Sequence, residues 1–150
     1  MASTISVGTL TVTVSESISL NGSTMGATNV LTVGSIAEIS QRIVSVDATN
    51  VRTLFEFGTV VGSGKFVLAN VQYIRITNKD DTNTVDINVA SAASNNWTVV
   101  AAGQSFMMSA QDGLQGVASG TVAVPVMADL VSISGYSANA IDLDCYVALT

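Results

Sequence analysis

The segment VQYIRITNKDDTNTVDINV, residues Val71–Val89, decides the fold. Apolar and polar residues alternate on both sides of its centre, and Val85, Ile87 and Val89 share one parity. Side chains point to opposite faces of a strand with period two, so both ends are predicted to be strands with one apolar face. The residues between them, 77–84, are nearly all Asn, Asp, Thr and Lys, which favour turns. We therefore predict a hairpin with a long, solvent-exposed tip.

The tip of this segment is the candidate interaction site of the chain. Polar side chains on a solvent-facing loop can meet a partner without disturbing a core. The candidate interface residues are Asn78, Lys79, Asp80, Asp81, Thr82 and Asn83.

Further alternating segments run along the chain. Thr9–Leu20 predicts a long half-buried strand bent near Glu16, followed by a turn at Asn21-Gly22 and a loop over residues 23–29. Ser35–Val46 begins with helix-like spacing, but its second part favours a strand over Glu38–Val46. The other predicted strands are Val30–Val33, Arg52–Val61 and Lys65–Leu68 around a Gly-Ser-Gly turn, Trp97–Ala101, Ser105–Ser109, Thr121–Met127, Leu130–Ser134 and Ile141–Leu149.

These segments predict one all-β domain spanning residues 1–150. Short strands recur with turn signals between them, and the only irregular stretch of any length is Ala110–Gly120. No repeat, linker or change of composition divides the chain. Such a pattern is typical of a β-sandwich, and we expect a jelly-roll-like arrangement.

The composition indicates how the surface is used. The chain is 48% hydrophobic but only 11% charged. A weakly charged exterior suits burial against neighbouring subunits, which favours a homo-oligomer. A monomer coated with Ser, Thr and Asn is the alternative, because natural surfaces are already largely apolar.

Charge is unevenly distributed along the chain. All five basic residues precede residue 80, and the part from Asp80 onward carries seven aspartates and no base. Phosphate backbones require clustered Lys and Arg, so we expect no nucleic-acid partner. The acidic half could face a basic partner, bind a cation or simply keep the protein soluble.

The chain shows neither a secretion signal nor a membrane span at the sequence level. Its first residues, MASTISVGTLTVTV, lack a charged segment followed by a continuous apolar run. No stretch reaches the 18 or so apolar residues that a span needs, so no membrane contact is expected. The single Cys145 cannot form an intrachain disulfide, which fits assembly in a cytosol.

The residues offer no catalytic constellation, and we expect a protein that is not an enzyme and has no cofactor or metal. Histidine is absent, which removes the usual general base and metal ligand. Cys145 has the apolar parity of its strand and is expected to be a buried core thiol. The pairs Asp80-Asp81 and Asp142/Asp144 could hold Ca²⁺, but solvated acids are the preferred interpretation because neither has a full ligand set. Trp97 could anchor the core or an interface, and burial in the domain is the preferred interpretation.

Four stretches carry a resemblance to a known group of proteins. They are TLTVTVSESISLNG at the start, YIRITNKDDTNTVDINV in the centre, Trp97 with AAGQSFMM after it, and IDLDCYVALT at the end. The chain resembles small virion structural proteins of tailed phages, particularly phages of marine cyanobacteria, over nearly its whole length.

The resemblance implies a non-enzymatic particle component assembled in the host cytoplasm. The leading hypothesis is a capsid decoration or cement protein whose partners are the major capsid protein or other virion subunits. A neck or tail component is the alternative within the same particle. A carbohydrate-binding jelly roll for host attachment is a third hypothesis, which would require exposed aromatic platforms.

Overall fold

The computed structural model describes residues 6–109 and 128–150, and it is nearly all β. A short 3-10 turn, η1 (Leu68–Asn70), is the helical element in the described part. Within those residues no helix is long and apolar enough to span a membrane. The strands are β1 (Gly8–Ser15), β2 (Ile18–Leu20), β3 (Ser23–Met25), β4 (Thr28–Ile36), β5 (Glu38–Val46), β6 (Val51–Gly58), β7 (Phe66–Val67), β8 (Val71–Asn78), β9 (Val85–Ser91), β10 (Asn95–Val100), β11 (Ser105–Ser109), β12 (Leu130–Tyr136) and β13 (Ile141–Leu149).

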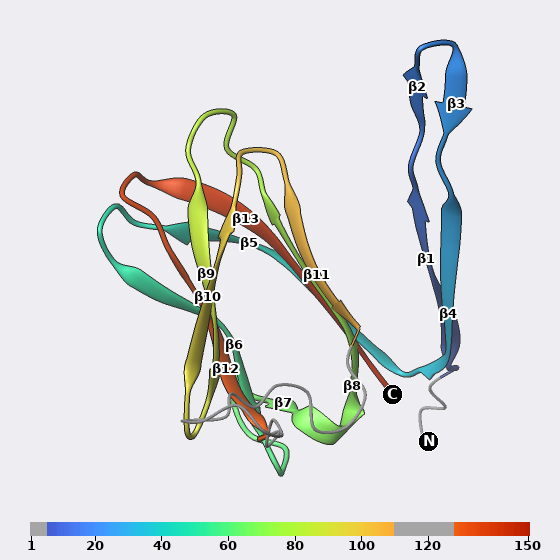
Figure 1. Cartoon of the computed structure of the whole chain (residues 1–150). Coiled ribbons are helices and arrows are strands. Elements are labelled where there is room, and N and C mark those ends of the chain that lie inside the picture. The colour runs from blue at the N-terminus through green and yellow to red at the C-terminus, as the bar shows by residue number, and fades with distance from the viewer. Residues whose placement is uncertain (1–5, 110–127) are drawn as a thin grey trace, which may run out of the picture.

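Two facing sheets form a sandwich (Figure 1). The first has the order β10-β9-β12-β6-β7, and the second has the order β11-β8-β13-β5. Without β7, the eight strands of the sandwich are, in chain order, β5, β6, β8, β9, β10, β11, β12 and β13. Numbered one to eight in that order, the first sheet reads 2-7-4-5 from β6 to β10, and the second reads 1-8-3-6 from β5 to β11. This winding is that of a jelly roll, so the predicted fold class is confirmed.

The core between the sheets follows from the period-two pattern. On β13 the residues Leu143, Cys145 and Val147 are fully buried, and Ile74 and Ile76 of β8 meet them from the neighbouring strand. Full burial of one such aliphatic side chain contributes about 1.5–3 kcal/mol. The expected burial of Cys145 is therefore confirmed.

The predicted hairpin over Val71–Val89 is wrong. Its two strands exist, but β8 and β9 belong to opposite sheets and do not pair with each other. Residues 79–84 arch from one sheet to the other across a gap of about 10 Å, the usual separation of packed sheets. Alternation identifies a strand but does not name its partner, and a loop of this length serves an arch as well as a hairpin.

The predicted strand–turn–strand around Gly62–Gly64 is also not a hairpin. β7 is short and pairs with β6 in parallel, through Phe57 opposite Phe66. A tight turn cannot join two parallel strands, because the chain leaving the end of β6 must first run back before β7 can proceed in the same direction. The expectations for Ala110–Gly120 and Thr121–Met127 fall entirely on residues outside the described ranges.

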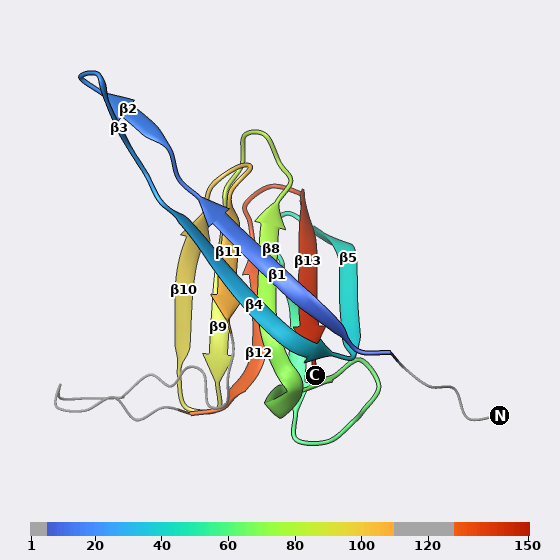
Figure 2. The ribbon, with the colours of Figure 1, turned by 90° about the vertical axis from the view of Figure 1, so that its right-hand side faces the viewer.

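A long β-ribbon projects from the sandwich (Figures 1 and 2). β1 pairs with β4 and β2 pairs with β3, and both pairings keep one register, from Leu10 opposite Val33 to Leu20 opposite Ser23. At about 3.3 Å per residue, this ribbon spans roughly 35 Å. We call residues 8–36 the arm. The predicted single strand over Thr9–Leu20 is interrupted near Glu16, where a bend was expected, and its predicted half-burial is wrong because most of its residues are exposed. The predicted loop over residues 23–29 is wrong as well, since β3 and the start of β4 lie there.

Candidate functional site

The six predicted interface residues lie at the end of β8 and in the loop that follows it, which is organised by Asn78, the last residue of β8. The Asn78 side chain is fully buried. Its Nδ2 donates to the carbonyl oxygens of Asn83 (2.8 Å) and Val100 (3.4 Å), and its Oδ1 accepts the backbone N–H of Asp80 (3.0 Å). A buried amide satisfied in this way holds the crossing between the two sheets in one conformation. Its role is structural, and its side chain is out of reach of a partner.

Asp80 and Asn83 also work within the loop. The Asp80 carboxylate accepts the backbone N–H groups of Asn83 and Thr82, the latter at 2.8 Å. These donors, that of Asn83 first, stabilise the charged form and hold the pKa of Asp80 below its ordinary value of 3.8. The Asn83 side chain accepts a hydrogen bond from Asn139 (2.9 Å) on the adjoining loop.

The accessible part of the loop is therefore smaller than the sequence suggested. Lys79, Asp81 and Thr82 are exposed. The backbone N–H of Lys79 is tied to the carbonyl of Asp142 at 2.9 Å, so the loop is anchored on both sides. Of the six predicted residues, a partner would therefore meet mainly one base, one acid and one hydroxyl.

The arm is a larger candidate surface, and the sequence reasoning missed it. In its register, Leu10, Val12 and Val14 of β1 lie on the same ribbon face as Leu31 and Val33 of β4. The same parity continues into the tip, where Ile18, Leu20 and Met25 share a face. The opposite face carries mainly hydroxyl side chains, including Thr11, Thr13, Ser15, Ser19, Thr24 and Thr32. The arm thus has one apolar face and one hydroxyl face.

The base of the arm is fixed to the sandwich through this apolar face. Leu10, Val12 and Val33 pack against a small cluster that includes Tyr73 and Ala148 on the outside of the β11-β8-β13-β5 sheet. Burial raises the pKa of the Tyr73 hydroxyl above its ordinary value. From this contact the arm crosses the sheet diagonally, and its tip extends past the sandwich (Figure 2).

The distal half of the apolar face has nothing on it in the described part of the chain. Ile18, Leu20 and Met25 are 58%, 60% and 59% exposed. A two-stranded ribbon has no second layer, and an isolated one is only marginally stable in water. An apolar face carried this far from the core is characteristic of a surface that binds another molecule.

The hairpin turn and a close backbone contact give the arm its shape. Asn21 and Gly22 have φ of 50° and 80°, as in the type I′ turn that Asn-Gly favours. At Gly26 an added Cβ would lie 2.0 Å from the carbonyl oxygen of Glu16, so only glycine allows the strands to approach here. The Asn-Gly signal, followed by apolar residues of matching parity, could have revealed the arm. The Gly/Ser/Thr-rich composition of residues 23–29 concealed it.

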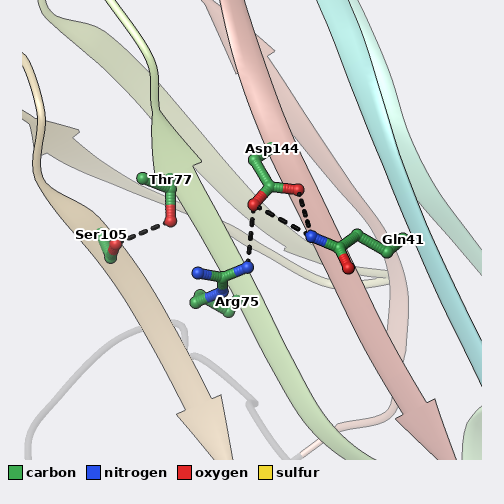
Figure 3. Close-up of polar contacts among 5 residues, drawn as sticks. All are labelled: Gln41, Arg75, Thr77, Ser105 and Asp144. Carbon is green, nitrogen blue, oxygen red and sulfur yellow. Dashed lines mark hydrogen bonds and ion pairs between the residues drawn. The ribbon is translucent and has the colours of Figure 1, made fainter.

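Polar side chains cover the outside of the sheet under the arm (Figure 3). Asp144 of β13 accepts hydrogen bonds from Arg75 at 2.8 Å and from Gln41 at 3.2 Å, and it forms an ion pair with Arg75. Thr77 and Ser105 join β8 to β11 through their hydroxyls at 2.7 Å. These contacts cross all four strands and stabilise the sheet from outside.

Trp97 lies on the surface and not in the core, so its predicted burial is wrong. It is 48% exposed on β10, directly opposite Asn88 of β9. Asn88 donates to Asn95 at 3.3 Å, while its own Oδ1 is buried and has no hydrogen-bond partner among the described residues. An exposed indole beside amide groups is a surface that can stack on a flat apolar ligand face.

The described residues hold no cluster of three or more side chains with metal-ligand chemistry. Asp142 accepts the Ser45 hydroxyl at 2.6 Å, and Asp144 is occupied by the contacts above. Burial raises the pKa of the Cys145 thiol to about 12, so it stays protonated and a poor nucleophile. No known protein family, curated protein or solved structure matches this chain.

Proposed function

We propose that this protein is a non-enzymatic structural component of a tailed-phage virion, a capsid decoration or cement protein bound to the shell through its arm. The apolar distal half of the arm carries the proposal. The jelly-roll fold supports it as well, since this fold recurs in viral capsid proteins. The resemblance of the sequence to small virion proteins points the same way.

The arm would act by burying its apolar face against a major capsid protein or another virion subunit. Binding of this kind favours the assembled state by mass action, because each bound copy lowers the free energy of the assembled particle and does not bind its dissociated subunits. The hydroxyl face would remain in water. A neck or tail subunit would use the same contact, and the location in the particle separates the two.

The test replaces Leu20 and Met25 together by serine. Burying the exposed part of these two side chains is worth about 2–4 kcal/mol, which corresponds to roughly a 100-fold loss of particle affinity on substitution. Both side chains are mainly exposed in the free protein, so the melting temperature should hardly change. Ser19→Ala with Thr24→Ala is the matched control, since this pair lies at the same height on the opposite face.

Co-sedimentation with assembled particles measures the affinity, and a melting curve checks the fold of each variant. We expect the serine variant to remain in the supernatant and the alanine control to pellet like the wild type. Equal pelleting of all three proteins would remove the arm from the interface. A wild-type protein that never pellets would overturn the proposed function.

Exposure of Trp97 favours a second candidate function, a carbohydrate-binding module for host attachment. Lectin domains are also found among jelly rolls, and the indole is flanked by amide side chains that could bond sugar hydroxyls. Trp97 is the single tryptophan of the chain, so its fluorescence reports on this surface alone. Titration with neutral oligosaccharides should shift that fluorescence if the second function holds, and a flat titration removes it.

A further inference from the structure

The strand β5 forms an open edge of the β11-β8-β13-β5 sheet (Figure 2). It pairs with β13 over nine residues, from Glu38 opposite Leu149 to Val46 opposite Ile141, without a bulge. On its other side no strand pairs with it among residues 6–109 and 128–150. Its backbone groups on that side are therefore placed to extend the sheet.

Of the devices that normally prevent edge pairing, β5 lacks proline and a bulge, and no charged residue lies on its outer face. Natural edges carry charges, proline or bulges that block a second strand. The outer face of β5 presents Ile39, Gln41, Ile43 and Ser45, with Ile39 57% and Ile43 60% exposed. The two charged residues of β5, Glu38 and Arg42, have the parity of the inner face, although both are exposed. The Arg42 guanidinium is held by a hydrogen bond to the carbonyl of Leu54.

We propose that β5 pairs antiparallel with β5 of a second copy of this chain, across a two-fold axis at Gln41. The spacing of the exposed residues selects this register. With Gln41 opposite its own copy, Ile39 of each subunit lies opposite Ile43 of the other, so both apolar residues gain a branched partner. A two-fold contact must be self-complementary. The alternating Ile39, Gln41 and Ile43 meet this condition, because they read the same in both directions from Gln41.

A neighbouring register fits less well. Centring the axis on Ser40 would place Glu38 opposite Arg42 of the second copy, but it would leave each Ile39 facing Gln41. It would also draw Arg42 away from its hydrogen bond to Leu54. The register about Gln41 keeps that bond and pairs the apolar side chains.

This interface joins two sandwiches into one continuous eight-stranded sheet. The arm crosses the outer face of the same sheet and does not supply the edge contact (Figure 2). A dimer through β5 could form with or without a virion.

Oxidative cross-linking tests the register directly. Gln41→Cys places two thiols opposite each other at the axis, within disulfide reach. Ser40→Cys is the control, because residue 40 then lies diagonally from its own copy at about 7–8 Å and on the inner face. The native Cys145 is fully buried, so the engineered thiol is the reactive one.

We expect Gln41→Cys to give a disulfide-linked dimer under mild oxidation, and Ser40→Cys to stay mainly monomeric. Ile43→Lys should weaken dimerisation at least tenfold in sedimentation velocity while leaving the melting curve unchanged. Gln41→Cys should cross-link equally well with and without the Leu20 and Met25 serine substitutions. Equal cross-linking shows that the arm is not needed for the β5 contact. A wild-type protein that sediments as a monomer at all concentrations, or stronger cross-linking through residue 40, would overturn the proposal.

Discussion

Replacing Asn78 by alanine should destabilise the protein by about 3 kcal/mol. The side chain is fully buried and makes three hydrogen bonds to backbone groups, at 2.8, 3.0 and 3.4 Å. Alanine fills less space and leaves those groups without the partner. Each buried group left unsatisfied costs about 1–3 kcal/mol, and we take the lower value because the loop is partly open to water. For a chain of this size the loss corresponds to a melting temperature roughly 6–12 °C lower.

Urea unfolding followed by circular dichroism measures this change, with Asp81→Ala as the matched control. Asp81 is three residues away in the same loop and is exposed, so its replacement should cost no more than about 0.5 kcal/mol. A loss below 1 kcal/mol for Asn78→Ala, or an equal loss for both variants, would refute the view that Asn78 fixes the arch between the sheets.

Two further predictions follow from the core and the arm. The Cys145 thiol has a pKa of about 12 in the folded protein, compared with 9.0 ordinarily. Below pH 9 the thiol is protonated in both the folded and the unfolded state, so its contribution to stability is complete. Between pH 9 and 12 only the unfolded chain ionises, and this contribution is lost. Cys145→Ala should cost about 1 kcal/mol at neutral pH and weaken the alkaline decline in urea unfolding, whereas an unchanged decline would contradict the buried thiol. Gly26→Ala forces a methyl group against the Glu16 carbonyl, and it should abolish particle binding without lowering the melting temperature. In the control Gly34→Ala the added methyl group meets no atom within 4 Å, and this variant should bind normally. Equal binding by both variants would show that the shape of the arm is irrelevant.

The strands themselves could be predicted because burial on one face imposes a period of two. Glu38–Val46, Ser105–Ser109 and Ile141–Leu149 have the predicted bounds. In Ile141–Leu149 the residues with apolar parity face the core, whereas in Glu38–Val46 only Val44 and Val46 do, and Ile39 and Ile43 are 57% and 60% exposed. In Ser35–Val46, where helical spacing competed with alternation, the last nine residues form a strand because each of them pairs with a residue of β13.

Pairing could not be predicted, because it depends on contacts between residues far apart in the chain. The loop after Asn78 is polar enough for a hairpin tip, yet it crosses between sheets. The interaction site was affected in the same way. Asn78 was expected to face a partner because it is polar and belongs to the predicted tip. It is instead the fully buried last residue of β8, and one of its hydrogen bonds reaches the carbonyl of Val100, 22 residues away.

Exposure was predicted least well, since composition does not say which apolar residues have a second layer above them. Leu20 alternates as regularly as a core residue, but it belongs to a ribbon that leaves the domain. Trp97 was expected inside because large aromatic side chains usually are, and it lies on the outer face of an edge strand. Both residues became candidates for binding only through the arrangement of strands in space.

A density map of the assembled phage particle tests the central claim most directly. The account predicts copies of this jelly roll at regular positions on the particle, with Ile18, Leu20 and Met25 of every arm buried against a neighbouring subunit. Particles that lack the protein, or arms that extend into solvent while another face makes the contact, would contradict it.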